Sequence, residues 1–175
     1  MGAAEMFASK IFVGPMVMIV VWLPIAVYIL MRVRDSQEQA ADIHLGIKVV
    51  ACWFQLAAAQ ILLLGSTILL YSIVEFGEEW RIGAGLVIPA LVIYGVLYLT
   101  LSATNSVERP SIRRMFRGIN LAYTGGIAFV GLLVGSVALF QEGASFANGS
   151  AIVAAVIVYT LSAGVQGTRL LREVR

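Results

Sequence analysis

The sequence predicts an all-α, polytopic integral membrane protein with five transmembrane helices in a single transmembrane domain over residues 1–175. Of its residues, 60% are hydrophobic and 13% are charged. Its mean hydropathy is +0.92, far more apolar than soluble proteins. Five stretches reach the length of about 20 apolar residues that an α-helix needs to cross a hydrocarbon core of roughly 30 Å. Most Lys and Arg residues lie between these stretches.

The five predicted spans are separated by short polar connections. The first apolar run is too long for the core of a signal peptide and lacks a small-residue cleavage site, so we expect it to remain as a helix. The second is longer than a bilayer requires, which predicts tilt or extension beyond the membrane. A basic loop is expected at 105–117. The predicted spans are about 11–31, 47–74, 82–103, 119–140 and 150–170.

The distribution of basic residues predicts the orientation. Cytoplasmic helix ends accumulate Lys and Arg. Of the 12 such residues, only Lys10 and Arg81 fall on one predicted side. An odd number of spans places the termini on opposite sides, and the basic C-terminal tail falls on the more basic side. We therefore predict an N-terminus outside, a C-terminus in the cytoplasm, and residence in a bacterial inner membrane.

A faint internal duplication relates the second span to the fourth and the third to the fifth. The aligned pairs include Gly65 with Gly135, at an offset of 70 residues, and Tyr94 with Tyr159, at an offset of 65. This pattern predicts one helix followed by two hairpins that run in the same direction through the membrane, which is a parallel repeat. Chance matches among small and apolar residues are the alternative.

Small residues in the fourth and fifth spans predict a close helix interface, because they let two backbones approach within a bilayer. The pair Gly131 and Gly135 forms a GxxxG motif. Packing within one chain and contact between copies in a homo-oligomer both fit this pattern. The candidate interface residues are Gly126, Gly131, Gly135, Ala155, Ala163 and Gly167.

The spans contain almost no charged residues, which argues against a carrier that uses a membrane-embedded acidic relay. Lys48 lies near the end of the second span, from where its side chain is expected to reach the interface. Uncharged polar residues could either bond neighbouring helices or line a path for an ion. The candidate polar path consists of Gln55, Gln60, Asn120, Thr124 and Gln166.

Four arginines in the predicted basic loop are candidate ligands for anionic lipid headgroups, at roughly 1 kcal/mol each near the surface. The sequence leaves the cofactor open, and a bound lipid is one candidate. The four residues are Arg109, Arg113, Arg114 and Arg117.

The only histidine, His44, is the candidate cofactor ligand. A haem held by two histidines would need a second ligand from a partner. A tetrahedral zinc site needs three or four ligands, and too few lie near His44, so no metal site is predicted.

No catalytic constellation or phosphate-binding loop is recognisable, so we do not expect an enzyme. A net charge of +2, with basic residues in short clusters, predicts no nucleic-acid partner. Membrane lipids and copies of the chain or other membrane subunits are the expected partners. The sequence thus predicts a non-catalytic membrane subunit that assembles with itself or with a larger membrane complex. The alternatives are a homo-oligomeric channel or carrier for a small ion or solute, and a haem-bearing membrane anchor that uses His44.

Overall fold

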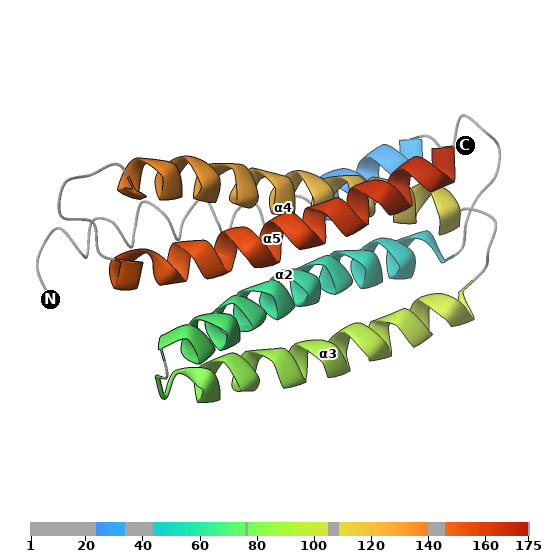
Figure 1. Cartoon of the computed structure of the whole chain (residues 1–175). Helices are drawn as coiled ribbons and strands as arrows, with labels where there is room; N and C mark the ends of the chain where they lie inside the picture. Colours follow the sequence, from blue (N-terminus) through green and yellow to red (C-terminus); the bar gives the residue numbers. More distant parts are fainter. Residues whose placement is uncertain (1–23, 34–43, 76, 105–108, 140–145, 175) are drawn as a thin grey trace, which may run out of the picture.

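The protein is built from long apolar helices (Figure 1). A computed structural model describes residues 24–33, 44–75, 77–104, 109–139 and 146–174. The helices are α2 (Leu45–Glu75), α3 (Trp80–Ala103), α4 (Arg109–Leu139), α5 (Phe146–Val174) and a shorter apolar helix, Pro24–Val33.

The four long helices confirm the all-α membrane fold class. Each is long and apolar enough to cross a membrane. The shortest, α3, has 24 residues, which at about 1.5 Å per residue exceeds the roughly 30 Å of a hydrocarbon core. The first predicted span, 11–31, lies largely outside the described residues.

The start of α4 corrects one boundary. A basic loop was expected to continue to Arg117, but the helix already begins at Arg109. Arginine is a good helix former, and Pro110 falls in the first turn, where its missing N–H costs nothing. The prediction of a loop over 109–117 is therefore wrong, and this basic segment belongs to a helix.

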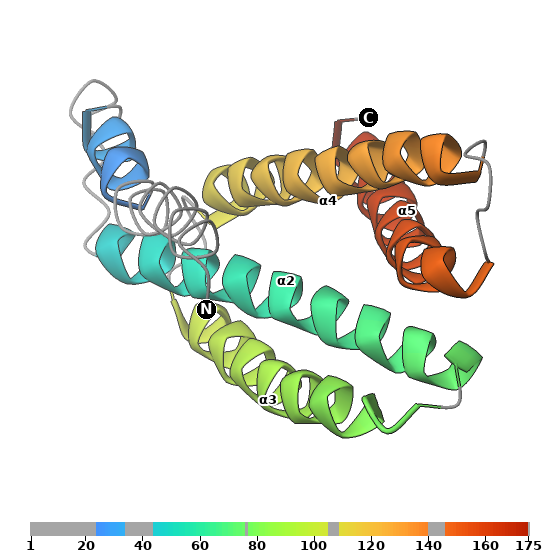
Figure 2. The same ribbon diagram turned by 90° about the vertical axis from the view of Figure 1, so that its left-hand side faces the viewer.

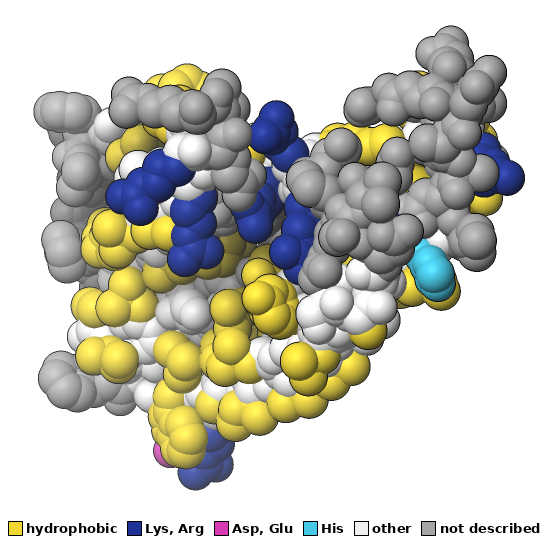
Figure 3. Space-filling view, turned by 90° about the vertical axis from the view of Figure 1, so that its right-hand side faces the viewer, with side chains coloured by type: hydrophobic (Ala, Val, Ile, Leu, Met, Phe, Trp, Pro, Cys, Tyr) yellow, Lys and Arg dark blue, Asp and Glu magenta, His cyan; other side chains and the backbone are white. Residues whose placement is uncertain are grey.

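The long helices form two antiparallel hairpins, α2 with α3 and α4 with α5 (Figures 1 and 2). Helix α2 is central, since it packs against α3, α4 and α5. Within this set of four helices, the backbone of α3 comes close only to that of α2. We call the end where α2 and α4 begin and α3 and α5 end the basic end, because Lys and Arg side chains gather there (Figure 3).

Two glycines bring α2 and α3 close together. A Cβ atom on Gly65 would lie 2.8 Å from Val87 Cγ2 and 3.0 Å from the carbonyl oxygen of Gly83. A Cβ atom on Gly83 would in turn lie 3.0 Å from the carbonyl oxygen of Gly65. Only residues without a side chain allow this approach.

The second hairpin has a similar glycine contact. A Cβ atom on Gly135 of α4 would lie 3.3 Å from Ile152 Cγ2 of α5. The sequence offsets of 70 and 65 residues map Gly65 onto Gly135 and Val87 onto Ile152. The two hairpins therefore place a glycine against a β-branched residue at aligned positions.

An apolar core lies at the basic end. It joins the helix Pro24–Val33 to α2, α3 and α4 through residues that include Val27, Cys52, Leu101 and Phe116. Away from this core, few side chains are covered: in α3 only Gly83, Ala90 and Leu101 are buried. Such a helix suits lipid, because in water an apolar face of this size would have to bind a partner.

The glycine contact yields a stability prediction. Gly65→Ala forces a methyl group against α3, which typically costs about 1–3 kcal/mol of unfolding free energy. Gly85→Ala is the matched control, because a Cβ atom there meets nothing within 4 Å. Thermal unfolding in mild detergent should show a lower midpoint for Gly65→Ala than for Gly85→Ala. Equal midpoints would contradict the close approach of α2 and α3.

Candidate functional site

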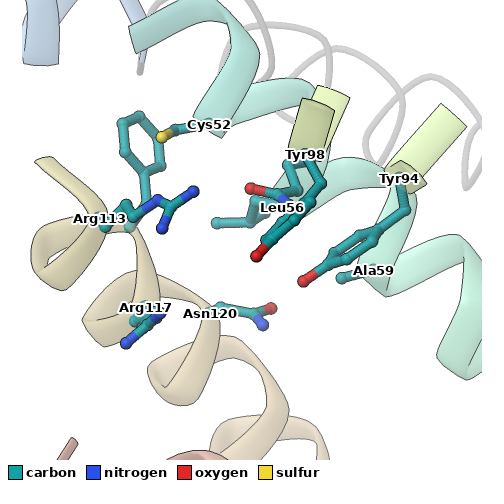
Figure 4. Close-up of a pocket in the computed structure, with 10 residues that line it drawn as sticks. Cys52, Leu56, Ala59, Tyr94, Tyr98, Arg113, Arg117 and Asn120 are labelled. Atoms are coloured by element: carbon teal, nitrogen blue, oxygen red, sulfur yellow. The ribbon is translucent and has the colours of Figure 1, made fainter. Parts of the chain in front are cut away.

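A polar pocket lies between α2, α3 and α4, next to the apolar core (Figure 4). Its volume is about 120 Å³. Ten described residues line it: Cys52, Gln55, Leu56 and Ala59 of α2, Tyr94 and Tyr98 of α3, and Arg113, Phe116, Arg117 and Asn120 of α4.

The α4 wall of the pocket is basic. Arg113 and Arg117 are four residues apart, so they lie on one face of the helix, one turn after the other. Both side chains are partly buried, whereas that of Arg114 between them is exposed. The guanidinium carbon of Arg113 lies 5.6 Å from the centre of the Tyr98 ring. This cation–π contact holds Arg113 across the gap between α4 and α3.

The α3 wall carries two tyrosines one helical turn apart. The hydroxyl groups of Tyr94 and Tyr98 point into the pocket (Figure 4). A tyrosine hydroxyl both donates and accepts a hydrogen bond, so each can donate to an anion while its ring faces the apolar surroundings.

A hydrogen bond between α2 and α4 lies beside the pocket. Gln60 Nε2 donates to Asn120 Oδ1 over 2.6 Å. Because this bond occupies the Asn120 carbonyl oxygen, the amino group is the end of the side chain that remains to donate. Asn120 therefore presents a donor to the pocket that it lines.

Hydrogen-bond donors dominate the pocket. Two guanidinium groups, two hydroxyls and the amino groups of Asn120 and Gln55 can all donate. No Asp or Glu is among its described lining residues. A site of this composition is complementary to a group that is negatively charged and rich in acceptor oxygens.

The residues of the predicted polar path are only partly brought together. Gln55 and Asn120 line the pocket, and Gln60 bonds Asn120. Thr124 is fully buried, and its hydroxyl donates to the Asn120 backbone oxygen at 2.9 Å. Gln166 stands apart on α5, where its Nε2 donates to Ser162 Oγ at 2.9 Å and its Oε1 is buried without a partner.

The predicted headgroup arginines divide into two groups. Arg113 and Arg117 line the pocket, and Arg114 does not. Arg109 is the first residue of α4, and its side chain falls outside the described part of the chain. The sequence did not separate the arginines that line the pocket from the one that does not, and headgroup binding by these residues stays a prediction.

The predicted interface residues differ in their surroundings. Gly131 and Gly135 face α5, where Cβ atoms on them would meet Val156 and Ile152. A Cβ atom on Gly126 or Gly167 would meet nothing within 4 Å. The remaining two, Ala155 and Ala163, are half-buried on α5. Assembly with copies of the chain or with other subunits stays a prediction.

His44 and Lys48 lie at the start of α2. The His44 side chain is exposed, and its backbone oxygen accepts the first helical bond from Lys48 at 3.0 Å. Lys48 was expected to extend to the interface but is fully buried, because it shares the inward face of α2 with Leu45 and Cys52. Among the described residues, no three His, Cys, Asp or Glu side chains form a potential metal site.

Sequence reasoning did not identify the tyrosine wall. The sequence analysis singled out Tyr94 only as the residue that aligns with Tyr159, and it assigned no role to Tyr98. Their spacing of four residues was the available signal, since it places both on one face of α3. That this face borders Arg113 depends on how the hairpins pack, which a single sequence does not reveal.

The sequence matches no protein-family model, and neither a curated protein nor a solved structure is significantly similar to it. Its function is therefore inferred from the pocket's own residues.

The Gln60–Asn120 bond predicts energetic coupling between α2 and α4. Single substitutions of either residue by Ala should each lower the unfolding free energy, and the double-mutant cycle should give about 0.6–1.7 kcal/mol of coupling. Reversible unfolding in mixed micelles measures it. Gln60→Ala combined with Gln166→Ala is the control, since Gln166 bonds Ser162 instead. Additive effects of Gln60→Ala and Asn120→Ala would refute the bond.

Proposed function

We propose that this protein is a non-catalytic integral membrane protein that binds an anionic group, a phosphate or a carboxylate, in the pocket between α2, α3 and α4. The observation that carries the proposal is the lining of the pocket: two arginines and several neutral donors, with no acidic residue among those described. Arginine suits this role, because its planar guanidinium forms paired hydrogen bonds with carboxylate and phosphate oxygens.

An anion also offsets an unfavourable arrangement of charge. Like charges four residues apart destabilise a helix by a few tenths of a kcal/mol when exposed. Arg113 and Arg117 are partly buried, where water screens their repulsion less effectively. A bound anion would accept hydrogen bonds from both groups and weaken their mutual repulsion.

The size of the pocket favours a small anionic group. Pockets that enclose whole drug-sized ligands or cofactors measure about 300–1,000 Å³, whereas this one measures about 120 Å³. It would therefore hold a headgroup while the rest of a larger ligand remains outside.

The hydrogen bonds of the polar residues favour binding over conduction. Gln60 and Asn120 bond each other, and Thr124 bonds its own helix. The Asn120 carbonyl oxygen and the Thr124 hydroxyl are already engaged within the protein, so these oxygen atoms are less available to replace the hydration shell of a permeating cation. A channel or carrier receives less support from this arrangement than a binding site.

We further propose that the basic end faces the cytoplasm. Arg113, Arg114, Arg169 and Arg172 lie near this end of α4 and α5. The α2–α3 connection lies at the opposite end and carries Glu78 and Glu79, and Arg81 follows in the first turn of α3. The positive-inside rule associates the more basic side with the cytoplasm.

Cys52 provides a direct test of anion binding, because it lines the pocket and is the only cysteine in the chain. We expect it to react faster with the anionic sulfonatoethyl methanethiosulfonate than with the cationic trimethylammonium analogue. At about 1 kcal/mol per charge, Arg113→Gln and Arg117→Gln should each slow the anionic reagent about fivefold and speed the cationic one about fivefold, which lowers the ratio of the two rates roughly 25-fold. Intact-mass spectrometry in neutral detergent measures both rates.

Arg114→Gln is the matched control, since it removes the same charge from the exposed side of α4. It should leave the ratio of rates nearly unchanged. A ratio near one in the natural protein, or an equal response to all three substitutions, would refute an anion-selective pocket. Any change in the thiol's own ionisation affects both reagents and cancels in the ratio.

The orientation is tested in a Cys52→Ser background. Glu78→Cys should react with a membrane-impermeant maleimide added to intact cells. Arg172→Cys, at the basic end, should react only after the membrane is opened. The reverse pattern would place the basic end outside.

A further inference from the structure

We infer that the anionic group is the phosphate of a membrane amphiphile, and that it enters the pocket from the bilayer through the opening between α3 and α4. This inference rests on the proposed anion binding and adds the source and chemical class of the ligand. It depends on which sides of the pocket are closed, which side is open, and what borders the open side.

The apolar core closes the pocket toward the basic end. Leu101 of α3 and Ile112 of α4 are fully buried, and Leu45 and Val49 of α2 are 1% exposed. Each lies nearer the basic end of its helix than the pocket residues of α2 and α3 or Asn120 of α4. Lys48 of α2 is the one charged side chain among the buried described residues of this layer. An anion from the aqueous phase would therefore have to pass a tightly packed and mostly apolar layer, which is costly for a charged group.

Other contacts close two further sides. The bond from Gln60 to Asn120 joins α2 to α4 at the end of the pocket farther from the basic end. Helix α5 packs against both α2 and α4. These three helices therefore close the pocket on the side away from α3. Among α2 to α5, the pairs α3–α4 and α3–α5 lack close backbone contact, and the pocket lies beside the first of these pairs.

The side between α3 and α4 is bridged by side chains. Arg113 reaches over the Tyr98 ring, and Leu101 and Ile112 belong to the same core cluster. Tyr94 and Tyr98 form the rim, with 39% and 52% of their surface exposed. Among the described residues, only side chains separate the pocket from the surroundings on this side, at a level of the bundle that spans the membrane.

The surroundings of the opening match an amphiphile. Large apolar side chains of α3 face outward next to the tyrosines, among them Leu91 and Leu99, which are 52% and 66% exposed. Acyl chains could lie along this surface while the phosphate contacts the two arginines and the hydroxyls. A headgroup bound in this way needs no passage through water, and the pocket only has to hold the headgroup.

The test uses nanodiscs of phosphatidylcholine with increasing amounts of phosphatidylglycerol, whose phosphate carries the net negative charge. Cys52 is reacted with neutral methyl methanethiosulfonate, so that the surface potential does not change the reagent concentration. We expect the rate to fall at least fivefold as phosphatidylglycerol rises to half of the lipid. The rate should fall only slightly in the double variant Arg113→Gln/Arg117→Gln. In Arg114→Gln it should fall as much as in the natural protein.

Two controls separate specific protection from other effects. The first control is Thr168→Cys in the Cys52→Ser background. Thr168 lies on an exposed part of α5 outside the pocket lining, so the reaction rate of the new thiol should not depend on phosphatidylglycerol. Tyr98→Phe keeps the ring beneath Arg113 but removes the hydroxyl, and it should shift half-protection to a several-fold higher phosphatidylglycerol content.

A second arm distinguishes the source of the phosphate. Glycerol phosphate is added at millimolar concentration to phosphatidylcholine nanodiscs and should protect Cys52 little. Protection by glycerol phosphate as strong as that by phosphatidylglycerol would overturn lateral entry but leave anion binding intact. Lateral entry would also be overturned if neither phosphatidylglycerol nor glycerol phosphate protected Cys52 while Cys52 kept its preference for the anionic reagent. Loss of the charge preference itself would overturn the proposed function.

Discussion

The close approach of α2 and α3 at Gly65 and Gly83 is the contact on which the rest of the arrangement depends. In a bilayer, apolar helices gain little from leaving lipid, so small residues and interhelical hydrogen bonds decide which helices associate. Here the glycines hold α3 against α2 alone. Because α3 is held there, its backbone stays apart from that of α4, and Tyr98 reaches α4 through the side chain of Arg113. The pocket is a consequence of that separation.

The two hairpins use this kind of contact at aligned positions, and they differ in what surrounds it. Gly65 meets Val87 in the first hairpin, and Gly135 meets Ile152 in the second. The aligned tyrosines have diverged in environment: Tyr159 is 6% exposed, whereas Tyr94 borders the pocket. The shared glycine contact supports a common origin of the hairpins. Of the two aligned tyrosines, only Tyr94 lies beside the polar pocket.

Hydropathy predicts the membrane-crossing part of each helix well. The limits of α2 and α3 lie within two residues of the predicted 47–74 and 82–103, since an apolar run bounded by charges marks where lipid begins and ends. The start of α4 was missed because a helix can continue into water without any apolar signal. The pocket was missed for a different reason: Tyr98, Arg113 and Asn120 come together only through tertiary packing.

The arginines of α4 show how a topological signal and a binding site can be told apart. Orientation by the positive-inside rule requires charge near the membrane surface, and the exposed side chain of Arg114 meets that requirement. The partial burial of Arg113 and Arg117 is not needed for orientation and adds a desolvation cost. For a fully buried ion this cost is several kcal/mol. The contact between Arg113 and Tyr98 recovers about 0.5–2 kcal/mol. A partly buried guanidinium held over a ring, among donors and with no described acid in the lining, is best explained by an anion that binds beside it.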